Sequence, residues 1–488
     1  MKKSISKYLI IGMITLGVSS CELGDFGDTN VNPNQTTQGI PSSLLTNAIN
    51  GLKGTIDATQ GQHYAQYLAN SQYTSADNYQ TIIFDYGGYY SGVLMDLEQI
   101  IVLNSDEETM VEASLYGSNA NQIAVAQILQ SYYYSFMTDR WGDIPYSQAL
   151  DIAEGVRQPA FDPQSEVYAS ILATLKTAQA NISSTAPVQG DILFGGDMDM
   201  WKKFANSIRL KMALRMSEVE PATAQAEFVS AVNDGVIALD NSENIYYNNL
   251  PEAAFQNAWY ARFLTRRDYA VANTLVNRMQ TTANGGVLNV SVDPRLSEYA
   301  DPTDIGGKYV GMPYGLSEAR AGAISNSDVS FLNEELRSQD APNYIFTSAQ
   351  ILFSMAEAAN RGWIPGDAEA YYYDGIEASL DQYGVSAGYN TYITNSWVVF
   401  DSSKALEQII TQKWIANFLN GYESWAEWRR TGFPNLQPGE DALNDSKQIP
   451  VRQAYPLFEL NLNSDNYNAV VARQGEDGLD TPVWWDVD

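Results

Sequence analysis

Side chains that could perform catalytic chemistry are scarce in this sequence of 488 residues. It contains one cysteine, Cys21, and one histidine, His63. An internal disulfide needs two cysteines, and a Cys/His zinc site needs more of these ligands than the chain offers. A Ser-His-Asp triad would have to use His63, which we expect to be a hydrogen-bonded structural residue. The sequence therefore predicts no catalytic residue, no metal site and no cofactor.

Carboxylates are plentiful, but no pair of them is singled out. The chain has 58 Asp and Glu residues against 28 Lys and Arg, a net charge of −30, which excludes nucleic-acid binding through phosphate neutralisation as a main activity. Two flanking carboxylates could hydrolyse a glycosidic bond, so a surface glycoside hydrolase stays open as an alternative. The pairs Asp197/Asp199 and Asp301/Asp304 lack the remaining ligands of a calcium-binding EF-hand loop, and we expect solvated turns there.

Aromatic residues are abundant, with 31 Tyr, 10 Trp and 16 Phe. Flat rings combined with so few bases and nucleophiles favour binding over catalysis. Three polar, turn-rich segments carry many of the rings: Tyr73–Tyr90, Asp240–Tyr260 and Asp301–Asn343. Loops of this length inside a compact body are usually functional or disordered, so we look for ligand contacts there.

The helical elements that must support these loops are visible as a repeating apolar pattern. In residues 119–137, Val125, Ile128, Leu129 and Tyr132 fall at steps of three and one, which defines one face of a helix. Similar faces occur in residues 167–178, 201–212, 351–359 and 406–414. Strand-like alternation is scarce. The sequence predicts a mainly α fold in which consecutive helices form tetratricopeptide-like pairs, and Asp162-Pro163 predicts a helix start with Asp162 as its cap.

The N-terminus has the pattern of an export signal. Lys2, Lys3 and Lys7 precede an apolar run over residues 8–20 that is too short to span a bilayer comfortably. Val18-Ser19-Ser20-Cys21 resembles a bacterial lipobox. The resemblance implies cleavage before Cys21 and acylation of its thiol with chains such as palmitate, which would anchor the protein in a membrane. We therefore expect a lipoprotein signal peptide at 1–20, a flexible tether at 21–38 and a single α domain at 39–488.

A family resemblance becomes specific after residue 138. The segment Asp139–Leu150, DRWGDIPYSQAL, is similar to the signature of SusD/RagB-type outer-membrane lipoproteins of Bacteroidetes. Asp28–Asn34 precedes it, and further family segments follow in the family's order, nearest to the SusD-like type 2 branch: Gly195-Gly196-Asp197, Trp201–Leu210, Asp293–Leu296, Ala356-Glu357-Ala358, Trp425–Gly432, Ile449–Pro456 and Trp484-Trp485-Asp486.

The resemblance implies a fold and a function. The fold is mostly α, with four tetratricopeptide-like helix pairs that support a loop-rich ligand-binding portion. The implied protein is a non-catalytic, lipid-anchored lipoprotein on the outer-membrane surface of a Gram-negative, Bacteroidetes-type cell. It would capture an oligosaccharide, or in some members a peptide, and deliver this nutrient to a SusC-like TonB-dependent transporter. A purely structural surface lipoprotein is a further alternative.

Most family-segment residues are expected to be structural. Gly142 and Gly196 suit turns that a side chain would obstruct. Trp425 and Trp428 are expected to pack in the core. The arginines Arg209, Arg215, Arg429 and Arg430 are expected to pair with buried carboxylates or backbone carbonyls.

The candidate ligand contacts come from the loops. In the family, such contacts come from loops in the first third of the chain and from the region before the Ala-Glu-Ala helix. Rings of Tyr and Trp can stack on the apolar faces of sugars, while amides and guanidinium groups take hydroxyls. Trp259 is the preferred stacking platform, although each ring could instead pack its loop onto the body. The predicted contacts are Asn78, Tyr79, Tyr86, Asn257, Trp259, Tyr260, Arg262, Tyr314 and Arg320.

Overall fold

Long amphipathic helices form the scaffold of the computed structural model, which describes residues 39–151, 155–280 and 292–487. The predicted signal peptide, Cys21 and the tether lie outside the described residues. From Pro41 onward the chain forms one unit, to which everything below refers. The helices of eight or more residues are α2 (Pro41–Asn50), α6 (Met95–Ser105), α8 (Asn119–Trp141), α9 (Gln164–Asn181), α10 (Met198–Arg215), α11 (Pro221–Asp234), α16 (Ser348–Asn360), α17 (Ala368–Gln382), α19 (Ala405–Ala416), α20 (Gly421–Thr431) and α22 (Ser464–Gln474).

Short helices and strands connect this scaffold. The short α-helices are α3 (Leu52–Ile56), α4 (Thr59–Tyr64), α5 (Gly87–Tyr89), α7 (Met110–Ala113), α12 (Ala258–Phe263), α13 (Asn273–Met279), α14 (Leu296–Tyr299), α15 (Glu318–Ala321), α18 (Tyr389–Tyr392) and α21 (Leu457–Leu462). A π-helical turn, η2, spans Tyr90–Leu94, and the 3₁₀ turns are η3 (Ser114–Tyr116), η4 (Asn326–Asp328), η5 (Glu335–Arg337), η6 (Ser386–Gly388) and η7 (Ser402–Lys404).

The strands are brief and pair in twos within the described residues. β1 (Leu68–Asn70) runs antiparallel to β5 (Tyr269–Val271), with Asn70 opposite Tyr269. β2 (Ile144–Pro145) pairs with β3 (Phe161–Asp162), and β4 (Ile245–Tyr247) pairs with β6 (Asn343–Phe346).

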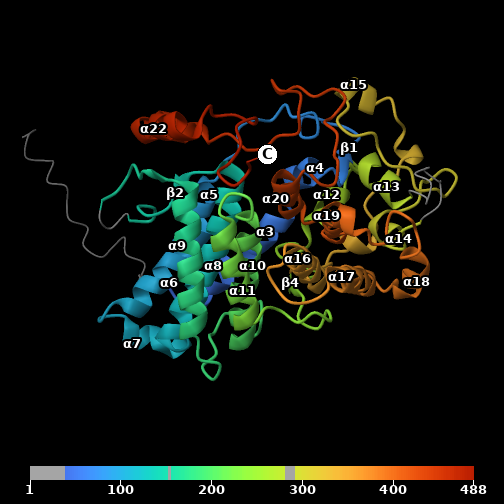
Figure 1. Ribbon diagram of the computed structural model, residues 1–488. Helices are drawn as coiled ribbons and strands as arrows, with labels where there is room; N and C mark the ends of the chain where they lie inside the picture. The colour runs from blue at the N-terminus through green and yellow to red at the C-terminus, as the bar shows by residue number, and fades with distance from the viewer. Residues whose placement is uncertain (1–38, 152–154, 281–291, 488) are drawn as a thin grey trace, which may run out of the picture. The chain divides into compact units, whose positions relative to one another are not determined.

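Consecutive helices pack as pairs, which confirms the predicted mainly α fold with tetratricopeptide-like helix pairs. α8 packs against α9, α10 against α11, and α16 against α17 (Figure 1). The predicted apolar face of α8 is inside, since Val125, Ile128 and Leu129 are fully buried. None of the described helices has the length and apolar character needed to cross a membrane.

Gly142 ends α8 and lets the chain approach the C-terminal part of the molecule. Its φ is +78°, and a Cβ placed there would lie 2.0 Å from Oε1 of Gln474. Gly196 has a φ of +90° at the turn before α10. Both turns confirm the prediction for these glycines.

The predicted cap of α9 is wrong in detail. α9 begins at Gln164, and Pro163 occupies the cap position. Asp162 lies in β3, where its carboxylate accepts hydrogen bonds from Tyr146 N (3.0 Å) and Ser147 N (2.8 Å). The backbone N–H of Gln164 instead donates to Oδ1 of Asp143 at 2.7 Å. Asp143, 21 positions earlier than Gln164, therefore accepts the hydrogen bond at the start of α9, because the carboxylate of Asp162 is bound to the backbone after β2.

Asp197 and Asp199 make contacts within the turn before α10 and the start of that helix. Oδ1 of Asp197 accepts hydrogen bonds from the backbone N–H groups of Asp199 (3.0 Å) and Met200 (3.2 Å), so Asp197 caps α10. Asp199 pairs with Lys202 at 3.3 Å.

The buried ionic cluster

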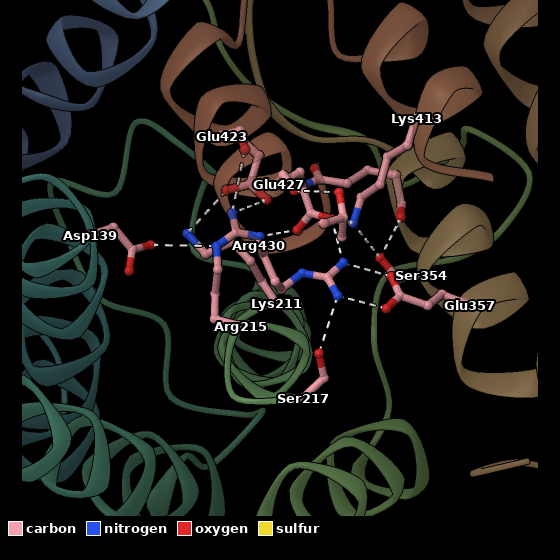
Figure 2. Close-up of polar contacts among 12 residues, drawn as sticks. Asp139, Lys211, Arg215, Ser217, Ser354, Glu357, Lys413, Glu423, Glu427 and Arg430 are labelled. Carbon is pink, nitrogen blue, oxygen red and sulfur yellow. Dashed lines mark hydrogen bonds and ion pairs between the residues drawn. The ribbon is translucent and has the colours of Figure 1, made fainter. Parts of the chain in front are cut away.

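A buried cluster of charged side chains joins four helices of the scaffold, α10, α16, α19 and α20 (Figure 2). Arg430 is fully buried, and its guanidinium donates to both carboxylate oxygens of Glu357 (2.6 and 2.7 Å) and to Glu427 (2.8 Å). Arg215, also fully buried, pairs with Glu423 at 2.8 Å and with Glu427. Lys413 joins at 3.3 Å from Glu427.

The charges of this cluster stabilise one another. Burial alone would raise the pKa of Glu357, but the attraction and hydrogen bonds of Arg430, together with the charges of Arg361 and Lys413, outweigh it and hold that pKa at about 2. Glu423 reaches a pKa of about 2 in the same way, with Arg215 as the main attracting charge. Lys413 has a pKa lowered to about 7 because burial penalises its charged form.

The arginine predictions are therefore confirmed. Arg209 pairs with Glu227 and Asp234. Arg429 donates to the backbone carbonyls of Asp139 (2.7 Å) and Val451 (3.0 Å). Trp425 is fully buried as predicted, whereas Trp428 is half-buried.

Candidate ligand-binding surface

Four chain segments distant in sequence meet at one surface, which we call the loop platform: residues 66–80, 264–268, 314–320 and 437–443. It lies near β1 and α15 (Figure 1). The N–H of Ser71 donates to the carbonyl of Asp268 (2.9 Å), and the N–H of Leu443 donates to that of Asn78 (2.8 Å). The N–H of Ser317 donates to Asp441 (2.7 Å). These long-range bonds position the loops, and the bond from Ser71 to Asp268 extends the short β1–β5 ladder by one residue.

Two glycines allow the third and fourth segments to touch. Gly315 has a φ of +68°, and a Cβ there would lie 2.2 Å from the Cα of Gly439. Any larger residue at position 315 would therefore push the two segments apart.

Tyr73 is the aromatic ring that the platform presents to solvent. This residue is 58% exposed. Its backbone φ is +59°, which is an unfavourable conformation for a residue with a Cβ. Such a conformation persists only where the surroundings enforce it, and it is concentrated at functional sites. Nδ2 of Asn70 donates to the carbonyl of Tyr73 at 3.2 Å.

A guanidinium contacts the ring of Tyr73, and two carboxylates lie close by in the fold. The guanidinium of Arg266 lies 4.7 Å from the ring centroid and pairs with Asp268 at 2.7 Å. The carboxylate of Glu318 accepts a hydrogen bond from Thr74 N at 3.1 Å. An exposed ring in contact with a guanidinium, with two carboxylates on neighbouring residues, provides the two kinds of contact that a sugar needs: a face for its C–H groups and partners for its hydroxyls.

Four of the predicted contacts lie together at this platform, but only one of them is at its surface. Asn78, Tyr79 and Tyr314 are buried beneath it. The rings of Tyr79 and Tyr314 are 6.3 Å apart, and the hydroxyl of Tyr314 donates to the carbonyl of His63 at 2.7 Å. Arg320 is half exposed and pairs with Glu440 and Asp441.

A second group of predicted contacts forms α12 and its cap. Asn257 accepts a hydrogen bond from Trp259 N at 2.7 Å, which starts the helix. Trp259 is only 1% exposed, and it packs between Tyr269 (centroids 5.4 Å apart) and the guanidinium of Arg262 (4.5 Å). Tyr260 and Arg262 are half-buried.

The expectation that Trp259 lies in a loop is therefore wrong, and the alternative that its ring packs onto the body describes its position. Residues 258–263 form a helix whose inward face carries the indole. The binding role of this group stays a prediction that would require the indole to be uncovered.

Tyr86 lies apart from both groups. It is fully buried against Trp141, with ring centroids 5.1 Å apart, and its hydroxyl donates to Oε1 of Glu459 at 2.8 Å.

His63 is structural, as predicted. It is fully buried, and its Nδ1 lies 3.1 Å from the carbonyl oxygen of Leu68. Burial lowers the pKa of His63 to about 4, so the imidazole is neutral near pH 7. Within the described ranges, no three His, Cys, Asp or Glu side chains are grouped so as to hold a metal ion.

The candidate contacts that were not predicted from the sequence are Tyr73, Arg266 and Glu318. Tyr73 was included in the first predicted loop but not among its contacts. Its signal is weak: a tyrosine between Gln72 and Thr74, with no apolar residue in Ser71–Asp77 other than Ala76.

The sequence matches a known family over most of its length. The SusD-like family described as "Starch-binding associating with outer membrane" matches residues 33–456. The chain belongs to this SusD-like family. The predicted resemblance is thus confirmed.

Solved structures share the SusD-like fold. A chitin-binding protein is 26% identical, with a TM-score of 0.78 over 92% of this chain and 100% of its own. A SusD homologue from Parabacteroides distasonis is 23% identical, with a TM-score of 0.78 over 92% and 98%. Another from Bacteroides fragilis is 24% identical, with a TM-score of 0.75 over 92% and 99%. No match is found among the curated proteins.

Proposed function

We propose that this SusD-like protein is a non-catalytic, cell-surface lipoprotein that captures an oligosaccharide at the loop platform and delivers it to a SusC-like TonB-dependent transporter. The observation that carries the proposal is the exposed ring of Tyr73, held in a left-handed backbone conformation beside Arg266. The starch-binding description of the family and the chitin-binding relative support a carbohydrate ligand.

The buried histidine and glutamates are engaged in structural contacts, which supports binding without chemistry. The single histidine is buried with a pKa of about 4, too low for a general base near neutral pH. The buried glutamates Glu357, Glu423 and Glu427 are held in ion pairs. A glycoside hydrolase would instead need two carboxylates free to face a substrate.

Calorimetric titration with malto-oligosaccharides, chito-oligosaccharides and short peptides tests the ligand. Loss of a stacking ring typically costs about 1–3 kcal/mol, so Tyr73→Ala should weaken oligosaccharide binding by about 5- to 150-fold. Tyr246→Ala is the matched control, because Tyr246 is 38% exposed and lies in β4, outside the platform. Equal affinity of wild type and Tyr73→Ala for every bound ligand would refute the platform.

Chromatography of the sugars after incubation tests the absence of catalysis. The proposal expects unchanged oligosaccharide after many equivalents have been incubated. Multiple-turnover cleavage that is abolished by one carboxylate substitution would establish a glycoside hydrolase instead. Failure to bind any glycan or peptide would favour a purely structural lipoprotein.

Anchoring and partnership need tests in cells. Cys21→Ala should leave the protein unlipidated and absent from the outer-membrane fraction, and normal partition of this variant would refute the lipid anchor.

Mild detergent extraction should co-purify a large β-barrel, because stable interfaces bury more than ~1,200 Å². Purification only as a free monomer under these conditions would count against the transporter partnership.

A further inference from the structure

A hollow in the protein lies away from the loop platform. It has a volume of about 460 Å³, and we call it the α21 pocket. Its described walls come from α5, η2, the start of α6, β2, residues 148–150 and 156–159, α21 and Asn463, with none from the four platform segments. Small-molecule sites usually occupy about 300–1,000 Å³, so the pocket has the size of a ligand site.

Most of the pocket wall is apolar. Met95, Leu150, Val156, Phe458 and Leu462 line it. Leu462 is 69% exposed, although burying a leucine side chain is worth roughly 1.5–3 kcal/mol. An apolar ligand body would cover this surface, and the polar side chains Ser91, Gln148 and Asn463 occupy the remainder of the wall.

A buried carboxylate provides one polar contact in the wall. Glu459 is 5% exposed; Oε1 accepts a hydrogen bond from Tyr86 (2.8 Å) and Oε2 accepts one from Asn463 (3.0 Å). Each carboxylate oxygen can accept a second hydrogen bond. A ligand N–H or O–H group is the complement of these open positions.

A cation provides the second polar contact. Arg157 lines the pocket and is exposed, and it makes no ion pair or hydrogen bond with the described residues. Many other arginines of this chain are paired with carboxylates, in a protein whose net charge is −30. An unpaired guanidinium at an apolar pocket fits an anionic ligand group.

We propose that the α21 pocket binds an amphipathic small molecule, with its apolar body against Phe458 and Leu462, an N–H or O–H donor at Glu459, and an anionic group at Arg157. This ligand class differs from the oligosaccharide of the loop platform. The pocket shares no lining residue with the loop platform and does not rest on the proposed function.

The probe 8-anilinonaphthalene-1-sulfonate tests the proposal, because it combines fused rings, one N–H donor and one sulfonate. Fluorescence titration of the wild-type chain should show saturable binding of one equivalent. Ala149→Trp fills the pocket and should weaken binding at least about tenfold. Ala226→Trp, at an exposed position of α11, is the matched control and should bind as wild type does.

Two further substitutions test the polar contacts. Glu459→Gln and Arg157→Gln should each weaken the probe by about three- to tenfold, since each removes one charged partner. Lys176→Gln removes an exposed charge from α9, outside the pocket, and should leave affinity unchanged. If Ala149→Trp loses its near-ultraviolet circular dichroism, Ser91→Trp in the same pocket replaces it. Wild-type affinity in the folded pocket-filling variant, or binding that does not saturate, would overturn the proposal.

Discussion

Replacing Arg430 by methionine should destabilise the protein far more than loss of a surface charge would. Arg430 is fully buried, and four hydrogen bonds of its guanidinium go to Glu357, Glu427 and Ser217 (Figure 2). Methionine fills part of the volume but leaves two buried carboxylates short of a cation. Breaking a buried pair in this way costs about 3–5 kcal/mol, and we expect the free energy of unfolding to fall by that amount at pH 8.

The pH dependence of this loss has a definite sign. In the wild type the pKa of Glu357 is about 2 in the folded state against 4.5 for the free group. The stability that Glu357 contributes is therefore fully present above pH 4.5 and is lost as the pH falls toward 2. Without Arg430, burial dominates and raises that pKa, so the folded variant binds a proton more readily than the unfolded chain. The difference between wild type and variant should shrink between pH 8 and pH 5.

Urea unfolding at the two pH values measures both effects. Arg361→Met is the matched control, because Arg361 contacts the same Glu357 (2.9 Å) but is 20% exposed and also pairs with the exposed Glu218. We expect this control to cost about 1 kcal/mol or less. Equal losses for Arg430→Met and Arg361→Met, or a loss that is constant with pH, would refute the reasoning.

Three further predictions follow from burial. Trp259→Ala should lower the free energy of unfolding, measured in urea, by about 3–5 kcal/mol. Its affinity for oligosaccharide at the loop platform, measured by calorimetry, should stay within about twofold of the wild-type value. Normal stability with lost binding would make Trp259 the ligand contact. His63, the only histidine, should titrate near pH 4 in an NMR experiment on its ring carbon, and a midpoint near 6.5 would contradict its burial. Burial raises the pKa of Asp77 from 3.8 to about 7. The folded state therefore holds this proton more tightly than the unfolded chain, and wild-type stability should fall as the pH rises between these values. Asp77→Asn should have a higher melting temperature than the wild type at pH 8, and a lower one would contradict this.

The helical scaffold could be predicted because its signal is local. Val125, Ile128 and Leu129 share one face of a helix by spacing alone, and all three are buried as that spacing predicts. The role of Arg430 was also accessible, because an arginine inside an apolar helix pattern needs a buried partner. The partner's identity was not accessible, since Glu357 lies 73 residues away in sequence.

The ligand surface depends on contacts that the sequence does not encode locally. Trp259 and Tyr73 both stand in segments that the sequence predicts to be polar and turn-rich, yet one is 1% exposed and the other 58%. The difference arises from tertiary structure: α12 directs Trp259 inward, whereas the bond from Ser71 to Asp268 fixes the loop that presents Tyr73. The predicted cap of α9 was wrong for the same reason, since the first backbone N–H of the helix is bound by Asp143, which is 21 residues earlier in the sequence.

A crystal structure of the protein with a bound oligosaccharide tests the central claim most directly. The account predicts a sugar ring stacked on the free face of Tyr73, with hydroxyls within hydrogen-bonding distance of Arg266 or Glu318, and with Trp259 still buried. A sugar bound against an uncovered Trp259, or at any surface outside the loop platform, would contradict it.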